Sequence, residues 1–211
     1  MFRLDGYFGR FMSVAWDVIW VGLLWLICSL PIITLGASTT AAYYAMSKSV
    51  RHKTGYVSKE FFRSFKLNFK NSTILTFVFI LLAGVIAVDV WYVWNHDNKT
   101  NSAIFVVLMG IAFCIACITV YVCPLLSRFE KKNFDLVKMA AVVAFKYLPI
   151  SIGIIVVFAL VCIGVWLMPW AVFFIPGVYF YLLSFPMEMI LRKLMPKPEE
   201  GSEEASKWYY Q

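Results

Sequence analysis

Long runs of apolar residues, separated by short polar segments, dominate the pattern of this chain. Four of these runs cover residues 71–94, 102–127, 148–168 and 170–191. Each is close to the roughly 20 residues that a helix needs to cross about 30 Å of hydrocarbon. A fifth run of similar length covers residues 11–30. The pattern predicts a membrane-spanning helix at each of these five places.

The segment after residue 30 is harder to interpret, because Pro31 and Gly36 interrupt the helical pattern. We expect Ser38 or Thr39 to cap a new helix that follows this break. That helix lies within residues 37–51, which are only moderately apolar. If it crosses the membrane the chain has six spans, and if it does not the chain has five.

The distribution of basic residues favours six spans, because Lys and Arg near span ends collect on the cytoplasmic side. With six spans and both termini inside, eighteen of the nineteen Lys and Arg residues lie inside, and Lys99 lies outside. With five spans, Arg3 and Arg10 change sides and the division is weaker. We therefore predict six spans with both termini cytoplasmic, and keep five as the alternative.

Two segments on the predicted inner side have the pattern of basic amphipathic helices. In residues 59–70, phenylalanines recur at helical spacing on one side, and Arg63, Lys66 and Lys70 lie on the other. Residues 133–146 have a similar pattern. Such helices are typical of the headgroup layer of an anionic leaflet. We expect both segments to lie there, in contact with membrane lipids.

Composition agrees with the pattern and excludes several classes of protein. Of the 211 residues, 62% are hydrophobic and 15% are charged, which is too little polar surface for a water-soluble domain. The unbroken apolar runs exclude a transmembrane β-barrel. The prediction is an all-α, polytopic membrane helix bundle formed by residues 1–195, with a disordered acidic cytoplasmic tail at 196–211. The net charge of +7 is explained by membrane orientation, so no nucleic-acid partner is expected.

Ionisable residues inside spans are costly and are therefore candidates for function or for a structural ion pair. Asp17 lies about two turns into the first predicted span and is open to either interpretation. Asp89, near the outer end of its span, is interpreted as a structural tether. Glu188 has Arg192 four residues later, which predicts an ordinary helical ion pair.

The sequence contains no recognisable catalytic or cofactor-binding pattern. The five cysteines all lie in apolar runs, and the two histidines lie on opposite sides of the predicted membrane, so no metal site is expected. Nucleophile, phosphate-binding and dinucleotide-binding motifs are absent. We expect a protein that is not an enzyme and that has no cofactor.

The break after the first span has two interpretations. It is either a packing device, with a stretch from Thr34 to Gly36 crossing in extended form and nearby hydroxyls satisfying backbone donors, or the substrate site of a small transporter. Small side chains just after it favour a close helix contact. The candidate residues of the break are Pro31, Thr34, Gly36, Ser38 and Thr39, and those of the helix contact are Ala37, Ala41 and Ala45.

Several motifs in the first 75 residues resemble the YesL family of bacterial integral membrane proteins. They are Met1–Gly6 with Gly9–Met12, Leu30–Ala41 with Tyr43–Tyr44, Gly55–Tyr56, and Phe61–Lys70. The resemblance implies a plasma-membrane protein of Gram-positive type bacteria, with a role around carbohydrate import and no assigned activity. It supplies no catalytic or binding residues.

Three function classes follow from these observations. The chain is expected to be an accessory or regulatory protein of a carbohydrate ABC uptake system, with the permease or the ATPase as its partner. The alternatives are a small transporter or channel, acting alone or as a homo-oligomer, and a membrane-organising protein that contacts lipids alone.

Overall fold

The computed structural model describes residues 7–95, 99–129 and 131–195, including all of their side chains except those at 7, 8, 10 and 99–102. Within these ranges the chain is helical and contains no strand. The elements in order are α1 (Tyr7–Ser29), η1 (Ile32–Thr34), α2 (Leu35–Ala45), η2 (Met46–Arg51), α3 (Val57–Asn95), α4 (Lys99–Leu126), α5 (Asn133–Lys146), α6 (Leu148–Leu167), η3 (Pro169–Phe173) and α7 (Ile175–Leu194).

Helix α2 lies at the centre of the molecule and contacts α1, α3, α4 and α7. Eight of its eleven residues are buried, and most of them are small. Small side chains let neighbouring helices approach the α2 backbone from several sides. The hydrophobic core therefore forms around this short helix.

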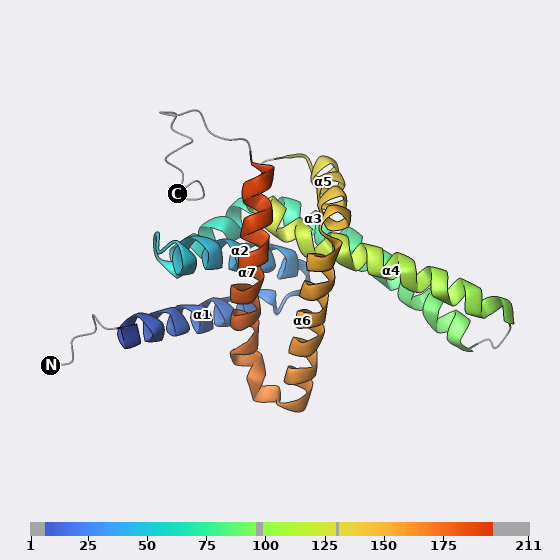
Figure 1. Cartoon of the computed structure of the whole chain (residues 1–211), viewed down its shortest axis with the longest axis horizontal. Coiled ribbons are helices and arrows are strands. Elements are labelled where there is room, and N and C mark those ends of the chain that lie inside the picture. The colour runs from blue at the N-terminus through green and yellow to red at the C-terminus, as the bar shows by residue number, and fades with distance from the viewer. Residues whose placement is uncertain (1–6, 96–98, 130, 196–211) are drawn as a thin grey trace.

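Two helical hairpins extend from this centre in different directions (Figure 1). One consists of α3 and α4 and the other of α6 and α7, joined by η3. Large apolar side chains on both hairpins are exposed, including Phe77, Leu81, Val106 and Leu160. An exposed apolar surface of this extent is expected where lipid replaces water as the solvent.

Four helical segments of the described chain are long and apolar enough to cross a membrane: Phe11–Ser29, Val57–Asn95, Ala103–Leu126 and Leu148–Leu167. They correspond to four of the six predicted spans. The predicted spans at 37–51 and 170–191 do not meet the same criterion. Helix α2 is short and contains several hydroxyl residues, and α7 has an acid and two bases near its C-terminal end.

The segments predicted as interfacial helices differ from each other. Residues 59–70 are not a separate helix, because α3 continues without a break from Val57 to Asn95. Residues 133–146 do form a helix of their own, α5, which ends at Tyr147 where the backbone leaves helical geometry (φ −115°, ψ 39°). The predicted acidic tail, 196–211, lies outside the described residues.

The structure contradicts the extended stretch that was predicted from Thr34 to Gly36. Pro31 has extended geometry (φ −75°, ψ 118°), but Ile32–Thr34 form a 3₁₀ turn and α2 begins at Leu35. Neither Ser38 nor Thr39 caps the helix, since both lie inside it. Helical geometry resumes directly after Pro31, so the helix starts about one turn earlier than the sequence suggests.

Candidate functional site

The hydroxyls of the helix break donate to backbone carbonyls and do not satisfy backbone donors as the sequence analysis expected. Thr34 Oγ1 donates to the carbonyl of Cys28 (2.5 Å), which ties the break to the end of α1. Ser38 Oγ donates to the carbonyl of Thr34 (2.9 Å), and Thr39 Oγ1 to that of Leu35 (2.7 Å). Such bonds to a carbonyl four residues earlier keep a hydroxyl satisfied inside a helix.

Side chains from other helices close the break. Trp25 Nε1 on α1 donates to Thr39 Oγ1 (3.1 Å), and Thr40 Oγ1 lies 3.4 Å from Ser72 Oγ on α3. A Cβ atom added to Gly36 would clash with Thr76 Oγ1 and lie 3.0 Å from the carbonyl of Ser72. The hydroxyls of Thr34, Ser38, Thr39 and Thr40 are therefore all bonded within the protein.

The small residues predicted for helix contact, Ala37, Ala41 and Ala45, are fully buried in α2. All three lie in the helix that contacts α1, α3, α4 and α7. Their burial makes α2 a packing centre.

A buried ion pair links helices that are distant in the sequence. Arg128 Nη2, just after α4, lies 2.7 Å from Glu188 Oε2 on α7, and the two side chains are 1% and 3% exposed. Tyr43 on α2 donates a long hydrogen bond to the same oxygen (3.4 Å). The predicted pair of Glu188 with Arg192 is present but longer, at 3.8 Å, with Arg192 half-exposed. Glu188 therefore connects α2, α4 and α7.

Arg51 and His52 surround this ion pair from the end of η2. Arg51 Nη1 donates to the carbonyl of Ser184 (2.5 Å), and its guanidinium lies over the ring of Phe185. Burial lowers the pKa of His52 below its usual value; Glu188 opposes this shift, and the neighbouring arginines reinforce it. We call Arg51, Arg128, Glu188 and Arg192 the inner charge cluster.

A second buried ion pair stabilises the turn between η2 and α3. Lys48 Nζ lies 2.8 Å from Glu60 Oε2, with both side chains largely buried. The turn between them contains two residues of positive φ, Lys53 (53°) and Gly55 (82°). Thr54 Oγ1 donates to the carbonyl of Lys48 (2.9 Å), which closes the turn.

The predicted basic face of residues 59–70 is exposed, with Arg63, Lys66 and Lys70 at the surface of α3. The opposite side is divided between the core and the surface: Phe61 is buried and Phe65 is partly buried, whereas Phe62 and Phe69 are 45% and 39% exposed. Phe61, Ser64 and Ser72 are buried in the protein core, because this half of α3 packs against α2. The segment therefore packs on α2 along one side and presents both basic and apolar side chains at its surface.

Asp17 lies in an open groove between α1 and the start of α3. The groove has a volume of about 290 Å³ and is lined by Trp16, Asp17, Trp20, Tyr56, Val57 and Ser58. Trp20 Nε1 donates to Ser58 Oγ (2.7 Å) across the groove. Within the described part of the chain, Asp17 forms no ion pair. Asp89 lies apart from this groove, exposed on α3.

Two glycines that the sequence analysis missed form the contact between α1 and α7. A Cβ atom on Gly22 would lie 2.8 Å from the backbone nitrogen of Gly177, and one on Gly177 would clash with the carbonyl of Val18. Lone glycines in apolar helices are a signal of close packing, but the sequence does not pair them. The partners of Glu188 at Arg128 and Tyr43 were missed for the same reason.

No three His, Cys, Asp or Glu side chains gather as a metal site in the described residues. The five cysteines are free thiols. The arrangement offers close packing, buried ion pairs and an open groove at Asp17.

Comparison with known proteins assigns no activity. Residues 18–90 match the family described as "Protein of unknown function, DUF624". The matched region contains most of α1, the break, α2, η2 and most of α3. No curated protein and no solved structure matches the chain. The matched region forms the central part of the helical fold.

Proposed function

We propose that the chain is a non-catalytic, multi-pass protein of the bacterial plasma membrane that acts as an accessory or regulatory protein of a carbohydrate ABC importer. Within DUF624 we assign it to the YesL type, on the motifs of its first 75 residues. The match to DUF624 at residues 18–90 is consistent with this assignment. The role in carbohydrate import is proposed because the resemblance to the YesL family implies it.

The main support for the accessory role is the helix break, whose hydroxyls are bonded within the protein. In a transporter of this size, a broken helix offers unpaired backbone or side-chain polar groups to a substrate. Here the hydroxyls of Thr34, Ser38 and Thr39 are all bonded to carbonyls. Helix α2 is also buried on most of its surface. A central helix whose hydroxyls are bonded within the protein suits a packing role better than a transport site.

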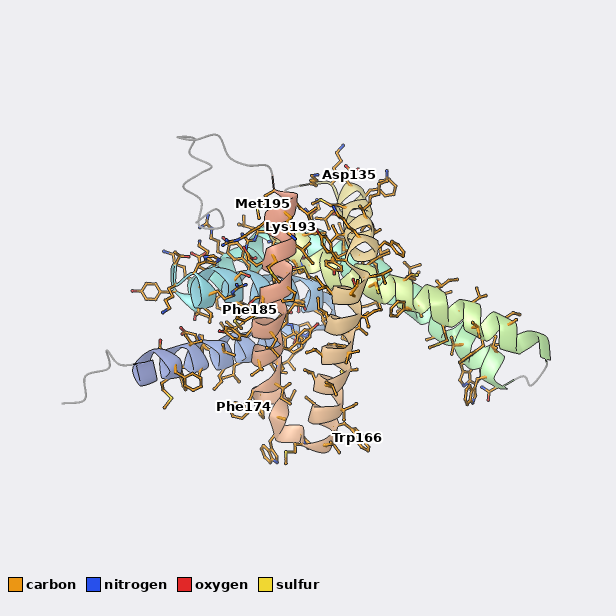
Figure 2. All side chains as sticks on the ribbon, in the orientation of Figure 1. Asp135, Trp166, Phe174, Phe185, Lys193 and Met195 are labelled. Carbon is orange, nitrogen blue, oxygen red and sulfur yellow. The ribbon has the colours of Figure 1, made fainter. Side chains whose placement is uncertain are left out.

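We further propose six spans with both termini inside. The inner charge cluster and the Lys48–Glu60 pair bring together the end of η2, the start of α3 and the C-terminal parts of α4 and α7. Six alternating spans place all of these segments on the cytoplasmic side, as five spans also do, so Arg3 and Arg10 remain the residues that favour six. Figure 2 is consistent with this orientation of the α6–α7 hairpin. Lys193 and Asp135 lie near one end of the hairpin, and Trp166 lies near the turn at its other end. Aromatic residues at an outer interface are common in membrane proteins.

The exposed basic face of α3 provides a surface for contact with a partner or with anionic lipid. Arg63, Lys66 and Lys70 project from a helix half that the protein core holds in place. Because this half packs on α2 and is continuous with the membrane-spanning half, its basic side chains are presented by a rigid element. A rigid basic face on the cytoplasmic side suits contact with an acidic surface of an importer subunit.

Affinity purification from native membranes tests the accessory role. The tagged chain should co-purify with a permease or an ATPase, and the variant Arg63→Glu with Lys66→Glu and Lys70→Glu should lose that partner while retaining its thermal stability. The same three positions changed to Gln serve as the control for charge reversal. Deleting the chain should reduce sugar uptake partially.

Transport by the purified chain would contradict the accessory role. If the chain alone in liposomes moved a sugar or an ion down its gradient, the transporter alternative would hold. Asp17 is the observation that favours this alternative, because it lines an open groove without an ion pair in the described residues. An acid that drives transport must change charge, so Asp17→Asn would then abolish uptake; for an accessory protein uptake should be nearly unchanged.

A further inference from the structure

The groove between α1 and α3 differs from the rest of the apolar surface in its lining. Three aromatic side chains and one carboxylate meet there, from α1 and from the turn before α3, which are nearly 40 residues apart in the sequence. Trp16 and Tyr56 are 65% and 82% exposed, so their rings are available to a ligand. A volume of about 290 Å³ is at the lower limit of small-molecule sites and is sufficient for a single headgroup.

The turn that carries Tyr56 is held in place by close contacts and hydrogen bonds. Gly55 has a positive φ, and a Cβ atom there would lie 3.0 Å from Glu60 Oε1, so the turn fits closely against that side chain. Glu60 is in turn held by Lys48, and its backbone nitrogen donates to the carbonyl of Tyr56 (3.0 Å). These bonds hold Tyr56 at the rim of the groove.

The chemistry of the lining indicates a cation. The indole N–H of Trp20 is used by Ser58 Oγ, so this ring offers its face rather than its donor group. The faces of Trp and Tyr rings attract cations, and quaternary ammonium groups are bound in this way by aromatic cages. Asp17 adds a negative charge that no ion pair of the described residues neutralises. An inorganic ion would need more oxygen ligands than one carboxylate supplies.

We propose that this groove binds an organic ammonium group, with Asp17 as the counter-ion and Trp16, Trp20 and Tyr56 as the aromatic walls. The same chemistry is offered by the headgroup of a zwitterionic amine lipid and by a free alkylammonium solute. This site is independent of the proposed accessory role, since it uses neither the basic face of α3 nor the inner charge cluster.

Choline and its neutral isostere 3,3-dimethyl-1-butanol provide a matched pair of probes. Binding of each to the purified full chain in nanodiscs of anionic phosphatidylglycerol is measured by saturation-transfer NMR and by titration. Choline should bind about tenfold more tightly or better, because the isostere has the same shape without the charge. Equal binding of the two would show a merely apolar groove and overturn the proposal.

Four variants locate the site. Asp17→Asn and, separately, Trp16→Leu should each weaken choline binding about tenfold. Asp89→Asn and Trp166→Leu are the controls, since they remove an exposed acid and an exposed tryptophan elsewhere in the chain. Thermal unfolding of each variant shows whether it is folded, and Trp16 is exposed enough for its replacement to be tolerated. Unchanged binding in folded Trp16→Leu, or an equal loss in the controls, would refute the assignment.

Lipid composition separates the two sources of the ammonium group. If a lipid headgroup occupies the groove, adding phosphatidylethanolamine to the nanodiscs should reduce choline binding by the wild-type chain. If the natural ligand is a free solute, choline binding should be the same in both lipids. Both outcomes support an ammonium site and identify its source, whereas absence of choline binding in both lipids overturns it.

Discussion

At the scale of single residues, the sequence pattern correctly predicts that Glu188 forms an ion pair, but it does not predict the closest partner of Glu188. Its spacing from Arg192 predicts an ion pair within one helix turn, and that contact exists at 3.8 Å. The shorter contact, at 2.7 Å, is to Arg128, sixty residues earlier in the chain. Since both side chains of the latter pair are buried, its charges are poorly screened and removing one of them is costly.

We predict that Arg128→Met destabilises the protein more than the double variant Arg128→Met with Glu188→Met. The single change leaves a buried carboxylate whose remaining ion-pair partner, Arg192, is half-exposed, at a cost of about 3–5 kcal/mol. The double change removes both charges, although Tyr43 then loses an acceptor. Thermal unfolding in detergent measures the difference. If the double variant were the less stable one, the ion pair would be a net source of stability.

At the scale of elements, glycine contacts decide which helices meet. Gly22 and Gly177 bring the backbones of α1 and α7 together, and Gly36 does the same for α2 and α3. Other glycines of the chain, such as Gly84 and Gly110, have no neighbour within 4 Å of an added Cβ. Some helical glycines therefore lie at close helix contacts and others face open space. Substitution by alanine should lower stability at the first kind and leave it unchanged or raise it at the second.

Gly177→Ala should destabilise the protein by about 1–3 kcal/mol, because the added methyl group meets the backbone carbonyl of Val18 and forces α1 and α7 apart. Gly110→Ala is the matched control. It should be neutral or stabilising by up to about 1 kcal/mol, since alanine favours a helix and the space there is open. Unfolding temperatures in the same detergent compare the two; equal shifts would mean that α1 and α7 do not pack at this position.

At the scale of the whole molecule, a short buried helix holds together two apolar hairpins that extend in different directions (Figure 1). The charged groups of η2, α3, α4 and α7 meet on one side of this centre. The exposed apolar surface of the hairpins is left for lipid or for other proteins. This arrangement is compatible with a location in a membrane.

Cysteine labelling in intact cells tests the six-span topology. In a cysteine-free background, single cysteines replace Arg3, Lys59 and Trp170, and an impermeant maleimide is added from outside. Only the cysteine at position 170, in the turn between α6 and α7, should react. Reaction at position 3 as well would establish five spans, because the N-terminus would then lie outside. Labelling after permeabilisation confirms that all three sites are reactive.

The sequence by itself predicted the helical fold and four helices that are long and apolar enough to cross a membrane, because run length and composition are local properties of the chain. It also placed a break at Pro31, since proline constrains its own backbone wherever it occurs. Its expectations were wrong where packing competes with local pattern. The phenylalanines of 59–70 form the same pattern whether they face lipid or protein, and the structure buries Phe61 but leaves Phe62 and Phe69 exposed.

Tertiary structure alone decided which residues meet. The pairing of Arg128 with Glu188, of Gly22 with Gly177, and of Trp20 with Ser58 depends on how helices far apart in the sequence pack around α2. The groove at Asp17 exists for the same reason, since its walls come from α1 and from the turn before α3. Periodicity describes one helix at a time, whereas a site between helices depends on their relative orientation, which packing sets.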